Sequence, residues 1–177
     1  MEHHNTAASD RDQHRAQTSA SSDVSQHTPF SNFVHQFTSQ DILARRIGRH
    51  YYLAEQRLWD MKHGIDRDLF SIGLYLGEEK HLFEPSPVMV ELLSKMPEAD
   101  SRKIFINKKA EWLFLCGRNL LPESVKNPNN LVSGFVLVQN ERDENLGYGL
   151  FKQQDTLIIK NVLDKGKYLR MNEKGRK

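Results

Sequence analysis

The sequence predicts an α+β fold: a small α/β region over residues 30–101, followed by a compact β-barrel-like module over residues 102–177. Three observations support this prediction. Residues 1–29 are almost entirely polar. From residue 30 to a polar stretch at residues 97–102, helical and strand patterns alternate along the chain. Beyond that stretch, the apolar period shifts toward two around a single helical segment, as expected for several short strands around one helix.

Residues 1–29 are expected to form a disordered tail. They are mainly Ser, Thr, Gln, His, Asp and Ala, and Val24 is their only strongly apolar residue besides Met1. Such a composition cannot bury enough apolar surface to offset the entropy lost on ordering. The segment also lacks an apolar core flanked by basic residues, so it is not typical of a secretory signal. About 148 residues remain to fold, which is enough for a hydrophobic core.

The first region is expected to begin with a short amphipathic helix. Apolar side chains recur there at helical intervals, at Phe30, Phe33, Val34 and Phe37. A strand centred near Tyr51 is expected to follow, because residues 50–55 read HYYLAE.

A second helix and a second strand are predicted next. The segment QRLWDMKHGI, residues 56–65, fits a helix, and the residues spaced along one side of it are Leu58, Met61, Lys62 and Ile65. Residues 69–76 then fit a buried strand.

A third helix is predicted after Ser86, which is a good N-cap. Pro87 suits the first helical position, where a missing N–H costs nothing. The expected buried face contains Met89, Val90, Leu92 and Leu93. Pro97 is expected to end the helix, which places the boundary between the two regions at residues 98–102.

In the second region, residues 103–107 fit a strand and residues 108–116 fit a helix of about two and a half turns. Gly117 stands where a helix C-terminus favours left-handed backbone. The remaining elements are a strand at 131–140, a turn at 141–145, its antiparallel return at 146–151, a strand at 156–160, and a final turn or helix at 161–170. Gly147 and Gly149 are expected at tight bends or close backbone approaches.

The helix at residues 108–116 contains Cys116, the only cysteine of the chain. A reactive cysteine needs an exposed, electropositive setting and usually a nearby base. Arg118 is close in sequence, but no histidine follows His81. Cys116 is therefore interpreted as a small buried hydrophobe, and the helix as packed scaffold.

Charge is distributed unevenly along the chain. Residues 103–177 contain 14 Lys and Arg against 8 Asp and Glu, whereas residues 1–102 contain 11 against 15. A basic half joined to a mildly acidic half suggests a polyanionic partner for the second half. The simpler alternative is a solvated, frayed C-terminus.

The composition also excludes several classes of protein. No run approaches the roughly 18 apolar residues of a membrane span, so no membrane partner is expected. A single cysteine excludes a disulfide framework within the chain and a multi-cysteine metal site. We expect a soluble, intracellular, monomeric protein without metal or cofactor.

The segments KIFINKKAEWLFLCGRNLLPESV and GFVLVQNERDENLGYGLF resemble a PUA domain, an RNA-binding module. PUA domains share a strand, a helix with an early alanine, an apolar run closing on glycine, two leucines, and a hairpin with spaced glycines. The corresponding positions are 104–106, Ala110, 113–117, Leu120, Leu121, Gly147 and Gly149.

A narrower resemblance covers roughly residues 30–170. The segments HYYLAEQRL, LFSIGLYLGE, AEWLFLCGRNLL, LGYGLF and IIKNVLDKGKYLR occur in the order and spacing of the Nip-seven-type ribosome biogenesis factors, and KKAEWLFLCGR is closer to archaeal members. This resemblance implies a pre-PUA domain at 30–101 and a PUA domain at 102–177. It also implies binding to uridine-rich single strands, maturation of large-subunit ribosomal RNA, and partners in the pre-ribosomal particle. Localisation would be cytoplasmic, or nucleolar in a eukaryote.

The family's RNA-contacting basic surface lies toward the C-terminus of the PUA domain. We therefore expect RNA contacts from Arg170, Lys174, Lys177, Lys165, Lys167 and Lys160, with secondary candidates at Lys108, Lys109 and Arg118. On a helix, Arg170, Lys174 and Lys177 would share a face. Lys and Arg dominate affinity for nucleic acid because they neutralise phosphates.

A non-catalytic binding protein is favoured over an enzyme. The sequence has no phosphate-binding glycine loop, no His-Glu-x-x-His zinc motif and no Gly-x-Ser-x-Gly elbow. Two alternatives remain: an RNA-modifying enzyme or its targeting subunit, and a protein-binding adaptor with incidental RNA affinity.

Overall fold

The computed structural model describes residues 28–64, 69–153, 158–167 and 170. The predicted tail lies outside these residues apart from Thr28 and Pro29. Those two residues are the N-cap and first residue of helix α1, Pro29–Val34. The Thr28 hydroxyl accepts from the Ser31 backbone N–H, and the Ser31 hydroxyl accepts from Thr28, so a capping box fixes the start of the helix.

The first sheet has four antiparallel strands in the order β1-β2-β3-β4. Their bounds are Arg45–Ile47 for β1, His50–Leu53 for β2, Leu74–Glu79 for β3 and Phe83–Pro85 for β4. The helix predicted from the phenylalanine spacing packs on one face of this sheet. Phe30 stacks on Tyr51 with ring centroids 4.8 Å apart, which confirms both the first helix and the strand near Tyr51.

Helix α2, Gln56–Asp60, continues as the 3₁₀ helix η1, Met61–Gly64, so the predicted second helix is confirmed in type. The side that carries Leu58 and Met61 is not the buried one. Trp59 is buried beneath the guanidinium of Arg45, whereas Leu58 and Met61 are exposed. The indole packs with Tyr52, Ala54 and Ile72 on the second face of the sheet, and this contact sets the rotation of the helix.

Strand β3 begins later than the predicted strand at residues 69–76. The reason is Gly73, whose φ of +67° is left-handed and interrupts the extended backbone. Leu74 and Tyr75 are exposed, and burial starts at Leu76.

The second sheet contains one parallel and two antiparallel pairings in the order β5-β6-β7-β8. Its strands are β5, Lys103–Phe105; β6, Gly134–Gln139; β7, Asn145–Phe151; and β8, Ile159–Asp164. Helix α4, Lys108–Leu115, packs beside them, and the 3₁₀ helices η3, Pro122–Ser124, and η4, Pro128–Asn130, lie in the connection to β6. The expected strand–helix–hairpin order is confirmed, while closure into a barrel stays a prediction.

The last strand differs from the prediction. Residues 161–164 were expected in a final turn or helix, but they extend β8. Asn161 pairs with Gly149, and Asp164 pairs with Gly147. A Cβ at Gly147 would overlap the Leu163 carbonyl oxygen, so the predicted close backbone approach is confirmed there.

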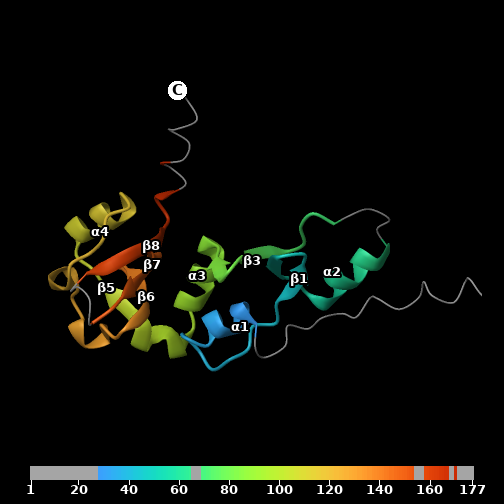
Figure 1. The fold of residues 1–177 in the computed structure, drawn as a ribbon, viewed down its shortest axis with the longest axis horizontal. Helices are drawn as coiled ribbons and strands as arrows, with labels where there is room; N and C mark the ends of the chain where they lie inside the picture. Colours follow the sequence, from blue (N-terminus) through green and yellow to red (C-terminus); the bar gives the residue numbers. More distant parts are fainter. Residues whose placement is uncertain (1–27, 65–68, 154–157, 168–169, 171–177) are drawn as a thin grey trace, which may run out of the picture.

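One hydrophobic core joins the two sheets. Helix α3, Pro87–Ser94, lies between them (Figure 1), with Ser86 as N-cap and Pro87 at its first position, as predicted. Phe33 of α1 lies 5.7 Å from Phe135 and 5.8 Å from Tyr148, measured between ring centroids. These aromatic contacts connect α1 to β6 and β7, so the second region packs against the first through a shared core.

The polar stretch at residues 97–102 is ordered as the 3₁₀ helix η2, Pro97–Arg102. Glu98 anchors it to the segment after α1. Its carboxylate accepts from the Ser39 backbone N–H at 2.6 Å, from the hydroxyls of Thr38 and Ser39, and from the amide of Gln40. These hydrogen bonds lower the pKa of Glu98 to about 2, with the Ser39 backbone N–H contributing most.

Candidate nucleic-acid interface

Helix α4 has two distinct faces, and only one is scaffold. Asn107 caps the helix by accepting from the Ala110 backbone N–H at 3.0 Å. Ala110 and Phe114, four residues apart, are buried against the second sheet. The opposite face consists of residues at the i, i+3, i+4 and i+7 positions, namely Lys108, Glu111, Trp112 and Leu115. Helix α4 thus contributes one face to the hydrophobic core and leaves the other face accessible.

Cys116 is exposed at the C-cap of α4, so its prediction as a small buried hydrophobe is wrong. The helix ends at this point because Gly117 adopts a left-handed φ of +83°. At this turn, the Cys116 side chain lies outside the buried face of the helix.

The side chain of Arg170, the first predicted RNA contact, is engaged by other residues of the fold. Its guanidinium makes a bidentate ion pair with Asp164, at 2.9 and 2.8 Å, and donates to the Leu115 carbonyl. The Asp164 side chain is only 4% exposed. Hydrogen bonding to Asp164 raises the pKa of Arg170. The pair connects β8 to the C-terminus of α4, where it satisfies a carbonyl that the helix leaves free.

A glycine makes this arrangement possible. A Cβ at Gly166 would overlap the Leu115 carbonyl oxygen and would lie 2.9 Å from the Arg170 guanidinium. Arg170 stays a predicted RNA contact, but its charge is already compensated within the fold.

Lys165 is also paired. Its ammonium lies 2.5 Å from the Glu91 carboxylate on α3, which links the end of β8 to the helix between the two sheets. This hydrogen bond is the largest of the contributions that lower the pKa of Glu91, and Lys95 contributes further. Glu91 therefore offsets part of the Lys165 charge that a phosphate would otherwise attract.

Lys167 lines a cleft of about 420 Å³ that also contains two carboxylates, Glu78 and Glu84. Tyr148 faces the same cleft, and its pKa is raised by burial and by the charge of Glu84. A polyanion is therefore disfavoured near Lys167. Lys174 and Lys177 lie outside the described residues.

Besides Lys167, four predicted cations are exposed and form no ion pair with any residue that the structure describes. They are Lys108, Lys109, Arg118 and Lys160. Lys108 and Lys109 begin α4, where the helix dipole favours anions. The other two are brought near each other by hydrogen bonds between the segment after α4 and β8. Asn161 donates from its backbone N–H to Asn119 at 3.0 Å. We call these four exposed positions the α4–β8 cationic surface.

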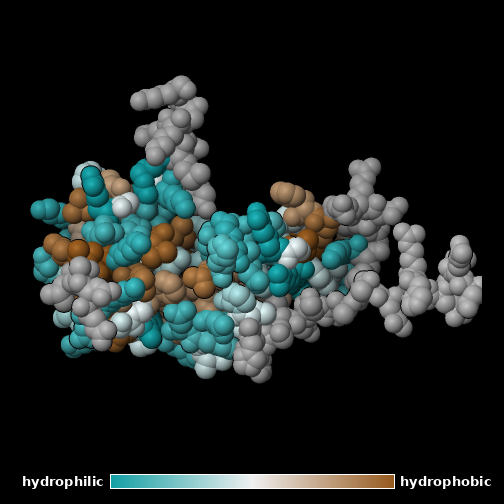
Figure 2. All heavy atoms as spheres, in the orientation of Figure 1, coloured by the Kyte–Doolittle hydropathy of each residue, from teal (hydrophilic) through white to brown (hydrophobic). Residues whose placement is uncertain are grey.

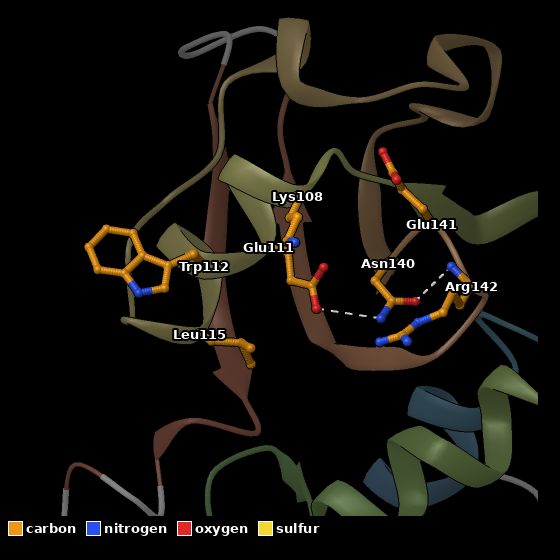
Figure 3. Close-up of a pocket in the computed structure, with 7 residues that line it drawn as sticks. All are labelled: Lys108, Glu111, Trp112, Leu115, Asn140, Glu141 and Arg142. Atoms are coloured by element: carbon orange, nitrogen blue, oxygen red, sulfur yellow. Dashed lines mark hydrogen bonds between the residues drawn. The ribbon is translucent and has the colours of Figure 1, made fainter.

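A groove of about 440 Å³ lies between α4 and the turn that joins β6 to β7. Figure 3 shows the indole of Trp112 on one side of it and Glu141 and Arg142 on the other, with Lys108 and Glu111 between them. Trp112 is 67% exposed.

The turn side of the groove is fixed by Asn140, which is buried. Its side-chain carbonyl accepts from the backbone N–H groups of Arg142, at 2.9 Å, and Glu144, at 3.0 Å. Its amide donates to the Glu144 carboxylate at 2.5 Å and to Glu111 at 3.4 Å. The Asn140 side chain thus accepts from two backbone N–H groups of the turn, and these hydrogen bonds fix the conformation of the turn.

Trp112, Asn140 and Arg142 were not predicted from the sequence as parts of a site. A signal for Trp112 existed: it is four residues after Lys108, so the two share a face that is opposite the buried Ala110 and Phe114. No local pattern connects α4 to Asn140, about 30 residues later, because that contact depends on strand pairing.

Among the described residues, no helix is long and apolar enough to cross a membrane. In the same part of the chain, no three His, Cys, Asp or Glu side chains are grouped so that they could hold a metal ion.

Comparison with known proteins places this surface in a recognised domain. Residues 102–173 match the UPF0113 PUA domain. A UPF0113 protein of Archaeoglobus fulgidus is 30% identical over 78 residues, covering 38% of this chain and 45% of that protein. The match thus covers less than half the length of that relative. Residues 102–173 of the chain carry a PUA domain, a module that is generally RNA-binding.

Proposed function

We propose that the chain is a non-catalytic RNA-binding factor of ribosome biogenesis that acts in maturation of large-subunit ribosomal RNA. It binds single-stranded, uridine-rich RNA through its PUA domain, as a monomer, in the cytoplasm or in the nucleolus of a eukaryote. Its partners are the pre-ribosomal particle and other assembly factors. The RNA class and the ribosomal role rest on the resemblance to the Nip-seven-type factors.

The observation that carries RNA binding is the α4–β8 cationic surface on a PUA domain, whose four cations are exposed and form no ion pair within the described part of the chain. Each cation that neutralises a phosphate releases a counterion, which makes the affinity depend on salt. Exposed cations without an internal partner can do this at no cost to the fold. The charges of Lys165 and Arg170 are instead offset by Glu91 and Asp164.

The ribosomal role is tested by crosslinking the full chain to RNA in cells and mapping the sites. The proposal expects crosslinks in precursor or mature large-subunit ribosomal RNA. Recovery of messenger or transfer RNA alone would contradict the ribosomal role and leave RNA binding in place.

A second candidate, a protein-binding adaptor, is favoured by one observation. Figure 2 shows hydrophobic spheres gathered around the start of β3. Phe70, shortly before this strand, is 93% exposed, and Leu74, its first residue, is also exposed. Exposed apolar patches often mark interaction sites. If the adaptor role is real, the double change Phe70→Ser and Leu74→Ser should abolish co-purification of a protein partner while RNA affinity stays unchanged.

A further inference from the structure

The two tryptophans of the chain have opposite environments. Trp59 is buried, with the guanidinium of Arg45 5.6 Å and the ammonium of Lys62 4.7 Å from its ring. Trp112 is largely exposed and, among the described residues, has no aromatic or cation–π partner. An exposed indole in a groove offers a large flat surface for another flat ring.

The groove around Trp112 is large enough for a small ligand such as one nucleotide. Its volume of about 440 Å³ lies within the usual range for small-ligand sites. Its far side is the rigid turn held by Asn140, and Leu115 adds apolar surface on the α4 side. Little reorganisation would be needed for a base to enter.

The charges in the groove are compatible with a phosphate. Lys108, one helical turn before Trp112, has no ion pair with a described residue. The two acidic groups are engaged: Glu141 pairs with Lys126, and Glu111 accepts from Asn140. Arg142 pairs with Glu144 at 3.3 Å but remains highly exposed. Lys108 therefore offers a cation one helical turn before Trp112, beside Glu111, whose negative charge is hydrogen-bonded to a neutral amide and not cancelled.

We infer that the groove between α4 and the β6–β7 turn is a subsite for one unpaired RNA base, which stacks on the Trp112 indole while an adjacent phosphate contacts Lys108. This inference rests on the proposed RNA-binding function and adds a site to it. Stacking on an aromatic ring is tolerant of base identity because every base has a π-face. The subsite therefore selects single strands over duplexes and does not itself read sequence.

The test compares Trp112→Ala with the wild-type full chain on two probes, a ten-nucleotide oligouridylate and an abasic ribose-phosphate strand of the same length. We expect Trp112→Ala to weaken oligouridylate binding by about 5- to 150-fold and to leave abasic binding unchanged. Trp112→Phe, which keeps a smaller ring, should recover part of the affinity. Leu121→Ala, an exposed apolar change outside the groove, is the matched control and should have no effect.

Intrinsic fluorescence gives an independent measurement. A base on Trp112 should quench its emission, and Trp112→Phe should abolish the quenching while the buried Trp59 continues to emit. Equal oligouridylate affinity in wild type and Trp112→Ala overturns the subsite and leaves RNA binding intact. An equal loss on both probes overturns base stacking as its cause. Failure of the wild type to bind either probe at low salt overturns the proposed function instead.

Discussion

The PUA domain has two cationic regions that differ in how much charge they can offer. Around the end of β8, Lys165 and Arg170 are paired with Glu91 and Asp164 and hold elements of the fold together. Around α4 and the start of β8, Lys108, Lys109, Arg118 and Lys160 are exposed and form no ion pair with a described residue. A count of cations along the sequence treats the two regions alike. A stretch of sequence that is rich in Lys and Arg therefore need not offer those charges to a ligand, because partners within the fold can neutralise them.

Substitutions on the two faces of α4 should differ most in their effects on stability and on RNA binding. Phe114→Ala should lower the free energy of unfolding by about 3–5 kcal/mol, because it leaves a cavity in the core of the second sheet. Trp112→Ala should change it by less than about 0.5 kcal/mol, because the indole is exposed. Urea denaturation of both variants provides the measurement. A large loss in Trp112→Ala would show that the indole is structural.

Arg170→Ala should be clearly destabilising, because it leaves the buried Asp164 carboxylate and the Leu115 carbonyl without their partner. Lys160→Ala, on the exposed side of β8, is the control and should unfold at nearly the wild-type temperature. Thermal unfolding followed by circular dichroism compares them. If Arg170→Ala melts with the wild type and instead flattens the salt dependence of RNA binding, Arg170 belongs with the free cations.

Acid should weaken the hydrogen bonds that join Glu98 of η2 to the segment after α1. The pKa of Glu98 is lowered from 4.5 to about 2 in the folded state, so its contribution to stability is present above about pH 4.5. That contribution is lost as the pH falls from about 4.5 toward 2. Glu98→Gln should be less stable at neutral pH and should lose less stability over this range. Urea midpoints at several pH values test this, with the exposed Glu123→Gln as control; identical pH profiles for wild type and Glu98→Gln would contradict it.

Lys165→Ala should lower the free energy of unfolding only slightly, by about 0.2–1 kcal/mol, because its ion pair with Glu91 is partly exposed. The change should be smaller in high salt, which screens the pair. RNA affinity should stay close to the wild-type value. A loss of RNA affinity as large as that of Lys160→Ala would show that Lys165 exchanges Glu91 for phosphate.

Much of the fold could be predicted from local patterns. The Phe30 and Phe33 spacing, the Ser86-Pro87 helix start and the Gly117 helix end each depend on a few neighbouring residues. The features that local patterns did not predict depend on tertiary contacts. Trp59 determines which side of α2 is buried, and the pairing of Asn161 with Gly149 extends β8.

The candidate site was harder to predict, because its components meet only after folding. Asp164 neutralises Arg170 across the turn after β8, and Glu91 reaches Lys165 from α3, 74 residues away. Neither partner is identifiable from the basic C-terminal sequence. Trp112 was identifiable as a helical neighbour of Lys108, but the groove needs the β6–β7 turn, which only the sheet places beside α4.

The most direct test is the salt dependence of oligouridylate binding by the fourfold variant Lys108→Ala, Lys109→Ala, Arg118→Ala and Lys160→Ala. If each cation neutralises one phosphate, the slope of log affinity against log salt should fall by about 2.8, at about 0.7 for each cation on a single strand. The folded state should persist, because none of the four forms an ion pair with a described residue. A variant that keeps the wild-type slope and affinity would contradict the account and would place RNA binding elsewhere on the chain.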